Sequence, residues 1–341
     1  MKCVDLFCGI GGLSLGLKLS GIEVLAGIDA WPQALDVYRL NHEHEALELD
    51  LADLKTATST ISRYDVDLIV GGPPCQDFSH AGKRVEGNRA NLTLSFAKIV
   101  AKIRPQWFIM ENVDRSQSSA AYADARKVYK KAGYGLTEKV LDASLCGVPQ
   151  KRKRFFCIGK LDEDDEFLLP VIDKKLARSP MTVRQYLGNE LDIDHYYRHP
   201  RNYSRRAVYS IDEPSATIRG VNRPVPKGYL GHANDKVSVG DVRPLTTLER
   251  ARIQTFPQDY CWSGSKTDIE QFIGNAVPAN LARFVGECIL TFSGISPNKD
   301  YSVRKRVLHK GQLRLCEPPP AAYISEIRKL TVAMPAKGAS K

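Results

Sequence analysis

Short apolar runs alternate with amphipathic stretches over the first 160 residues, and this alternation predicts strands and helices in turn. Apolar runs bounded by glycine or polar residues are typical of buried strands, whereas apolar positions repeating every three to four residues indicate helices. We expect strands at 2–7, 22–29, 47–51, 66–70 and 106–110. We expect helices at 13–19, from Pro32, at 91–103 and at 122–131. The pattern predicts an α/β fold with a doubly wound, Rossmann-like sheet.

The alternation is lost between about residue 166 and residue 265, where Arg, Tyr, Pro and turn residues accumulate. Arginine among aromatics in an irregular lobe suits contacts to phosphates and base edges. Helical patterns return after Thr246 and after Pro278, and a Gly274-Asn275 turn is expected before the second. We therefore predict one domain from 1–165 plus 266–292, a second at 166–265 and a basic extension at 293–341.

Composition narrows the class of protein. The chain has 341 residues, 43% hydrophobic residues and a net charge of +10, of which +6 lies in residues 300–341. A positive balance suits a polyanion, although the main part of the chain is only mildly basic. We expect no membrane span and no secretory signal, hence an intracellular protein with reduced thiols. The eight cysteines contain no Cys-x-x-Cys pair and no metal site is expected, with His42/His44 and His195/His199 interpreted as exposed polar pairs.

A glycine-rich turn follows the first strand. Cys8-Gly9-Ile10-Gly11-Gly12 lies between strand and helix, where glycines let a ligand approach the backbone. The spacing differs from the dinucleotide motif, and no Lys follows as in a phosphate loop, which disfavours NAD and ATP. Asp29 ends the second strand and is placed to bind ribose hydroxyls, or to cap the helix after it. Both roles of Asp29 are compatible.

A stiff turn stands at the end of the fourth strand. Gly71-Gly72-Pro73-Pro74 stops the strand, and Cys75 follows at once. A thiol on a rigid loop at the carboxyl end of a central strand is well placed to be a nucleophile, but a lone cysteine is more often a buried structural residue. The pattern alone leaves both interpretations of Cys75 open.

Further candidate side chains come from two later segments. Glu111 leaves an apolar strand, where a partly apolar pocket would raise its pKa and suit it to donate a proton; alternatively it caps the next turn. Arg152 and Arg154 are spaced by two, so they lie on one face of an extended segment. They could reach phosphates or a base edge in a site, or form a solvated basic patch.

Six motifs in one order resemble the DNA (cytosine-5)-methyltransferases of the bacterial and phage modification type. The resemblance covers residues 1–290. The motifs are Asp5-Leu-Phe-Cys-Gly-Ile-Gly-Gly12, Gly72-Pro-Pro-Cys75-Gln76, Glu111-Asn112-Val113, Gln150-x-Arg152-x-Arg154, Arg243-Pro-Leu245-Thr246 and Gly274-Asn275-Ala-Val277-Pro278.

The resemblance implies a role for each matching residue. Cys75 would attack C6 of a cytosine flipped out of the duplex, Glu111 would act as the acid on the base, and Arg152 and Arg154 would support the flipped base. S-adenosylmethionine would be the methyl donor, with no metal. The implied cofactor-binding residues are Phe7, Gly9, Gly11, Gly12, Asp29, Asp50, Leu51, Pro73, Leu92, Asn275 and Val277.

The resemblance also implies a DNA-binding surface. Residues 166–265 would be the target recognition domain, with Thr217-Ile218 similar to the family's Thr-Ile/Leu pair, and a loop at 80–91 would close over DNA. The implied DNA-binding residues are Lys83, Arg84, Arg89, Arg205, Arg206, Thr217 and Arg219. Two departures stand out: Ala30 replaces an aromatic that some relatives place against adenine, with Trp31 one residue late, and Ala90 replaces a glycine after Arg89.

Two other functions remain open at this point. One is a tRNA cytosine-5 methyltransferase of the same superfamily, against which the long Arg/Tyr-rich lobe argues. The other is a catalytically inactive DNA-binding protein, against which the intact Cys75, Glu111 and Arg154 argue. We expect a monomeric cytoplasmic enzyme associated with the nucleoid, acting on double-stranded DNA, with a restriction endonuclease as a genetic partner only.

Overall fold

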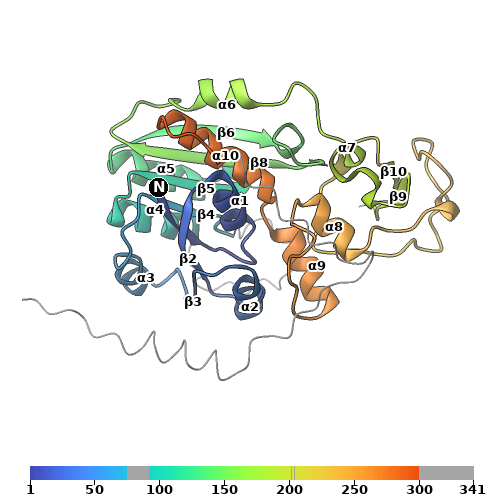
Figure 1. Cartoon of the computed structure of the whole chain (residues 1–341), viewed down its shortest axis with the longest axis horizontal. Helices are drawn as coiled ribbons and strands as arrows, with labels where there is room; N and C mark the ends of the chain where they lie inside the picture. The colour runs from blue at the N-terminus through green and yellow to red at the C-terminus, as the bar shows by residue number, and fades with distance from the viewer. Residues whose placement is uncertain (75–91, 201, 203, 299–341) are drawn as a thin grey trace, which may run out of the picture.

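The computed structural model describes residues 1–74, 92–200, 202 and 204–298, arranged as a sheet domain with a lobe at one end (Figure 1). Its strands are β1 Lys2–Leu6, β2 Glu23–Asp29, β3 Glu45–Glu48, β4 Leu68–Gly71, β5 Trp107–Val113, β6 Tyr134–Asp142, β7 Gln150–Lys151, β8 Lys153–Leu161, β9 His195–Tyr197, β10 Val208–Ser210 and β11 Ser215–Ala216. Its α-helices are α1 Gly12–Ser20, α2 Pro32–Asn41, α3 Leu54–Ile61, α4 Leu92–Ile103, α5 Ala120–Lys131, α6 Leu169–Lys175, α7 Val183–Leu187, α8 Thr247–Ile253, α9 Lys266–Asn275 and α10 Ala279–Phe292.

The main sheet has seven strands in the order β3-β2-β1-β4-β5-β8-β6. The first five of these pair in parallel, and β8 runs antiparallel to both β5 and β6. The strand order reverses between β1 and β4, which is where open α/β sheets bind ligands beyond the carboxyl ends of their strands. The doubly wound, Rossmann-like fold expected from the sequence is confirmed.

Two separate cores cover the two faces of the sheet, because neighbouring strand residues point to opposite sides. Leu68, Val70 and Ile109 pack on the α1 and α10 side. Ile69 and Phe108 pack on the side covered by α3, α4 and α5. All five side chains are fully buried. Among the described residues, every helix is too short or too polar to cross a bilayer.

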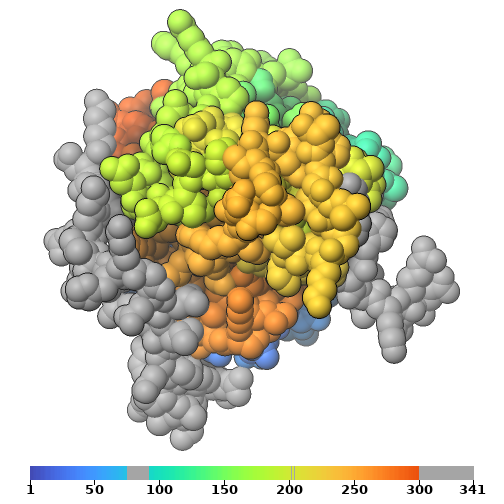
Figure 2. Space-filling model, turned by 90° about the vertical axis from the view of Figure 1, so that its right-hand side faces the viewer, coloured from blue at the N-terminus to red at the C-terminus, as the bar shows by residue number. Residues whose placement is uncertain are grey.

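The lobe has its own core, built from short elements. Trp262, Phe256 and Tyr196 are buried there with residues of α7, α8 and α9. The cluster reaches Ile10 and α2, so the lobe packs against the sheet domain (Figure 1). Figure 2 looks onto the lobe, which covers most of this face of the molecule. α6 instead buries Ile172 in the core of the sheet domain. The domain boundaries themselves stay a prediction.

Several predicted elements need correction. The third strand was expected at 47–51 but ends at Glu48, because Asp50 turns the chain by accepting a hydrogen bond from Ala52 N. Glu111 lies inside β5, paired with β8, rather than beyond the end of the strand. The expected Gly274-Asn275 turn is instead the last turn of α9. α9 was missed although Ser265 and Asp268 form a capping box at its start.

His42 and His44 are not the exposed pair that the sequence suggested. His42 is buried and His44 is half-buried, beside Tyr38. Burial lowers the pKa of His42 to about 3, and it lowers the pKa of His44 to about 4. His195 and His199 are also only half-exposed.

Candidate active site

A cavity of about 520 Å³ lies at the carboxyl ends of β1, β2, β4 and β5. Its size is that of a pocket for a drug-sized or cofactor-sized ligand. The predicted cofactor residues in its lining are Phe7, Gly9, Gly12, Asp29, Pro73, Asn275 and Val277. Gly11, Asp50, Leu51 and Leu92 are described but are not part of this lining. The structure thus brings together residues far apart in the sequence.

The turn after β1 forms one wall of the cavity. Phe7 adopts a positive φ of 58°, which turns the chain sharply at the strand end. Gly12 packs so closely against the segment after α9 that a Cβ on Gly12 would overlap the carbonyl oxygen of Val277. The motif near residue 10 and the motif near residue 275 are therefore in direct contact, as a shared ligand site requires.

Asp29 lies in a second wall of the cavity and holds two backbone groups there. One carboxylate oxygen accepts a hydrogen bond from Gly9 N at 2.8 Å, and the other accepts one from Trp31 N at 2.9 Å. Burial raises the pKa of Asp29, although these hydrogen bonds oppose the shift. Trp31 lines the cavity and packs edge-on against Phe272, with ring centroids 4.8 Å apart. Trp31 thus places an aromatic ring in the cavity wall, one residue after Ala30.

Asp5 is a site residue that the sequence analysis quoted in a motif without giving it a role. It is fully buried, it lines the cavity, and its Oδ2 accepts hydrogen bonds from Ser14 N at 3.1 Å and Ser14 Oγ at 2.6 Å. Its Oδ1 has no hydrogen-bond partner among the described residues. Burial raises the pKa of Asp5 to about 7. A carboxylate inside an otherwise apolar strand was the signal that could have revealed it.

Glu111, which is buried, and Arg154, which is half-buried, form an ion pair in the lining of the same cavity, with Nε 3.0 Å from Oε1. Burial raises the pKa of Glu111, while the charges of Arg154 and Arg152 act in the opposite direction. Next to Glu111, Asn112 donates a hydrogen bond to the carbonyl oxygen of Pro73 at 3.0 Å. This bond ties the β5 end to the turn that precedes Cys75. Cys75 itself lies outside the described residues.

The whole sheet domain and lobe match one known family. The C-5 cytosine-specific DNA methylase family matches residues 1–291. The chain belongs to the C-5 cytosine-specific DNA methylases. Its activity is therefore methylation of cytosine C5 in DNA, and the alternative of an enzyme acting on tRNA has less support.

Two curated relatives of this methylase are similar over nearly their whole length. The type II methyltransferase M.HindV of Haemophilus influenzae is 56% identical over 295 residues, covering 86% of this chain and 97% of the relative. The type II methyltransferase M.HgiDI of Herpetosiphon aurantiacus is 52% identical, covering 86% of this chain and 95% of the relative.

Solved structures support the fold alone. The S. pombe Dnmt2 methyltransferase superposes with a TM-score of 0.65 at 21% identity, covering 85% of this chain and 98% of that one. A putative DNA modification methyltransferase encoded in an Escherichia coli prophage gives 0.63 at 19% identity, covering 86% and 99%. These structures share the fold of this chain over most of both chains.

Arg152 has a more structural position in this methylase than the motif implied. It is buried, and its guanidinium donates to the carbonyl oxygens of Ile218, Gly274 and Ala276, each at 3.1 Å. Burial lowers the pKa of Arg152, an effect that Arg154 reinforces and Glu111 opposes. Although Arg152 also lines the cavity, its described hydrogen bonds join the sheet domain, the lobe and the segment after α9.

The predicted DNA-binding residues fall into three groups. Lys83, Arg84 and Arg89 lie outside the described residues. Arg205 is exposed, whereas Arg206 makes a bidentate ion pair with Glu213 and lies 4.1 Å from the centroid of the Tyr209 ring. Thr217 Oγ1 donates to the carbonyl oxygen of Lys151 at 2.7 Å, and Arg219 donates to that of His199. Among the described residues, no group of His, Cys, Asp or Glu side chains could hold a metal ion.

Proposed function

We propose that this methylase transfers the methyl group of S-adenosylmethionine to C5 of a cytosine flipped out of duplex DNA, through a covalent bond between Cys75 and C6. One observation carries the proposal: the Glu111–Arg154 pair lines the cavity, and Asn112 beside it is hydrogen-bonded to the turn that precedes Cys75 in the sequence. An acid and a cofactor-sized cavity thus lie together at the end of the chain segment that leads into Cys75. A base inside a stacked duplex could not reach them, so it must leave the stack.

The cavity suits S-adenosylmethionine. Asp5 and Asp29 place carboxylates in the lining, and the free lone pairs of Asp5 Oδ1 suit a cationic group of the cofactor. Phe7, Trp31 and Phe272 offer aromatic surface for its base. When bound, the cofactor supplies an electrophilic methyl group on a sulfonium. The protein residues then have to make C5 of cytosine nucleophilic.

Each proposed catalytic residue contributes one part of that activation. Cys75 as a thiolate would add to C6, which converts the ring into an enamine; C5 would then take the methyl group as its bond to the sulfonium breaks, and the cofactor would leave as a neutral thioether. Glu111, whose pKa burial raises, donates a proton at N3 and so stabilises the addition. Arg154 fixes the Glu111 carboxyl through the 3.0 Å contact. Removal of the C5 proton by a base, with return of the N3 proton to Glu111, would then expel the Cys75 thiolate and restore the ring.

The test is methyl transfer by the Cys75→Ser variant of the full-length protein. We expect transfer from labelled S-adenosylmethionine to duplex DNA to vanish, while equilibrium binding of the cofactor stays within twofold of the unaltered protein. Cys261→Ser is the matched control. Cys261 is a half-buried free cysteine that does not line the cavity. Persistent transfer by Cys75→Ser would disprove the covalent step.

A second arm tests the substrate. Duplex DNA and tRNA are offered to the same preparation, and we expect incorporation into DNA only. Incorporation only into tRNA would overturn the proposal. We further propose that the enzyme acts as a monomer on the DNA of the cytoplasmic nucleoid, in a restriction-modification or orphan modification role.

A further inference from the structure

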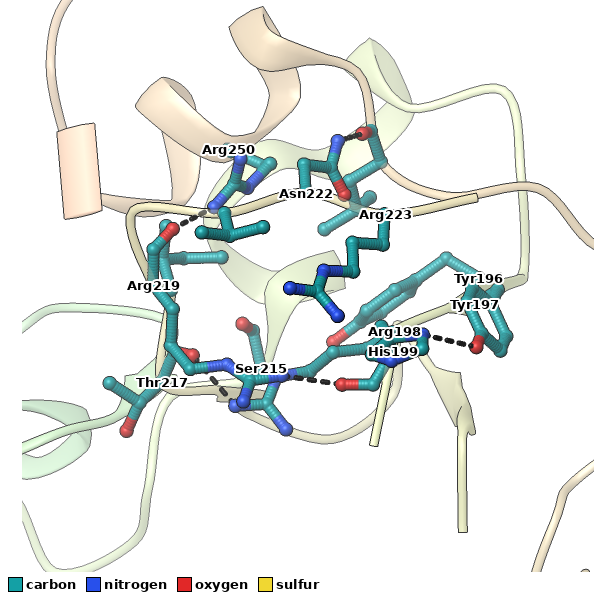
Figure 3. A pocket seen from close by; sticks show the side chains of 13 residues that line it. Tyr196, Tyr197, Arg198, His199, Ser215, Thr217, Arg219, Asn222, Arg223 and Arg250 are labelled. Atoms are coloured by element: carbon teal, nitrogen blue, oxygen red, sulfur yellow. Dashed lines mark hydrogen bonds between the residues drawn. The ribbon is translucent and has the colours of Figure 1, made fainter. Parts of the chain in front are cut away.

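A second, small pocket of about 30 Å³ lies inside the lobe and is strongly cationic. Arg198, Arg219, Arg223 and Arg250 all line it, together with Tyr196 and Tyr197 (Figure 3). Arg250 forms a buried ion pair with Glu270. Burial lowers the pKa of Arg250 to about 10, and the charges of Arg219 and Arg198 contribute. Positive charges thus crowd one another here, which makes the pocket attractive to an electron-rich ligand.

Three arginines, Arg198 and Arg250 of the pocket lining and Arg152 from outside it, each hold one carbonyl of the chain segment beside the pocket. The carbonyl oxygen of Thr217 accepts from Arg198 Nη2 at 2.9 Å, and that of Arg219 accepts from Arg250 Nη2. Between them, Ile218 accepts from Arg152 Nη1 at 3.1 Å. We call residues 217–222 the recognition ledge. Its backbone is fixed by side chains at three consecutive residues.

The far end of the recognition ledge is fixed as well. Asn222 Nδ2 donates to the carbonyl oxygen of Leu245 at 2.7 Å. Gly220 lies against α9 so closely that a Cβ on Gly274 would overlap its backbone. The ledge is therefore a rigid support, and side chains that leave it outward start from defined positions.

Two side chains at the outer end of the ledge are exposed. Val221 is 60% exposed, and Arg223 follows two residues later. Arg223 makes no hydrogen bond or ion pair with any described residue, whereas Arg198, Arg219 and Arg250 all donate to carbonyl oxygens. In Figure 3 its guanidinium extends into the space between the ledge and the segment Tyr196–His199. The five N–H donors of the Arg223 guanidinium thus extend from a fixed segment of the backbone.

We propose that Arg223 is a specificity-determining residue that reads a guanine of the DNA target through its O6 and N7 atoms. The guanidinium fork matches these two acceptors in the major groove, and no other base pair offers the same pattern. Because Arg223 extends from a rigid segment, it is better suited to read a base edge than to contact the DNA backbone. A phosphate can be reached from many positions and needs no fixed ledge. The proposal rests on the proposed function, since it needs duplex DNA as substrate.

The experiment compares the methylated motif of the unaltered protein with that of Arg223→Ala and Arg223→Lys. Each full-length protein methylates the same bacterial genomic DNA, and the 5-methylcytosines are sequenced. We expect both variants to lose discrimination at one guanine of the motif, with kcat/KM on the original site falling between about 5-fold and 150-fold. Arg178→Ala is the control, because it removes an exposed arginine of the same region that lines neither the cavity nor the pocket.

The atom that Arg223 contacts is tested with 7-deazaguanine, which lacks N7, at that position of a synthetic duplex. We expect this duplex to be a poorer substrate for the unaltered protein but no worse than the normal duplex for Arg223→Ala. An unchanged motif, or equal weakening at every sequence with a shallower salt dependence, would overturn the proposal, the latter identifying a phosphate contact. If the unaltered protein left duplex DNA unmethylated, the proposed function would fail first. Matching thermal unfolding curves ensure that the variants are folded.

Discussion

The sheet domain and the lobe are stabilised in different ways. In the sheet domain, backbone groups pair along seven strands, and alternate side chains form two apolar cores. Among its described residues, the lobe has the β9–β10 pair, the two-residue contact of β11 with β7 and a single bridge between Tyr197 and Pro244. There, arginines and glutamines supply the partners that neighbouring strands would otherwise provide. Irregular backbone can be buried when side chains satisfy its carbonyls one by one.

In such a lobe the backbone is irregular, but the outward-facing residues are less constrained in sequence. Residues of a strand are constrained by both neighbours, whereas an anchored ledge constrains only the groups that face inward. If the lobe reads the DNA target, as proposed above, its outward side chains could change without disturbing the anchored backbone. The following variants test how far the contrast holds.

The largest effect is expected from Phe108→Ala in the sheet domain. Phe108 is fully buried, stacks on Tyr129 at 4.2 Å between centroids and meets Tyr134 edge-on at 5.0 Å. Truncation leaves a cavity and should reduce the free energy of unfolding by about 3–5 kcal/mol. Denaturant unfolding followed by fluorescence measures this. Phe108→Leu should lose clearly less, and equal losses would contradict the cavity explanation.

A loss of about 3 kcal/mol is expected from Arg152→Met, since removing the guanidinium leaves three buried carbonyls without their donor. Lys153→Met, which removes the exposed neighbouring cation, should stay within about 0.5 kcal/mol. Denaturant unfolding measures the free energy of unfolding of both variants. Similar values for the two would mean that Arg152 is dispensable as a structural link between sheet domain and lobe.

Gly274→Ala should cost about 1–3 kcal/mol, because the added methyl overlaps the backbone of Arg219 and Gly220. The displaced ledge should also weaken discrimination between DNA sequences. Gly228→Ala is the control, since nothing lies near a Cβ there. Thermal unfolding together with methylation of a sequence panel separates the two effects. Normal discrimination in Gly274→Ala would show that the ledge tolerates a shift.

The last prediction concerns acid pH alone: His42→Gln should change how stability depends on pH. His42 has a pKa of about 3 in the native state, below its ordinary value of 6.5, so only the unfolded state takes up this proton between these values. Native stability is therefore lost as pH falls from about 6.5 towards 3, by at most about 1.4 kcal/mol per pH unit. Unfolding free energies at several pH values should fall less steeply for the variant. Parallel curves would contradict a neutral buried His42.

The sheet domain was largely predictable from sequence because its signals are local. Short apolar runs and the glycines that follow them located β1, β2 and β4 within one or two residues. Errors arose where a polar side chain decided the outcome. Asp50 ends β3 early through its own turn, and Glu111 stays inside β5 because β8 pairs beyond it.

The lobe and much of the site were not predictable in this way. Nothing near Arg152 in the sequence indicates that its partners are Ile218 and Gly274, because those contacts span more than 60 residues. The roles of Asp5 and Trp31 in the cavity likewise depend on the packing of distant segments. Cys75 remains a prediction from its motif.

The packing of α10 has a consequence for the order in which the chain is made. Leu281, Val285 and Ile289 of α10 share a core with Leu13 and Leu17 of α1. A ribosome synthesises α1 first and α10 only after the entire lobe. The face of the sheet that they cover together stays open to solvent until about residue 290 has emerged. The nascent protein must therefore carry an exposed apolar surface through most of its synthesis, and its folding is completed by its last described helix.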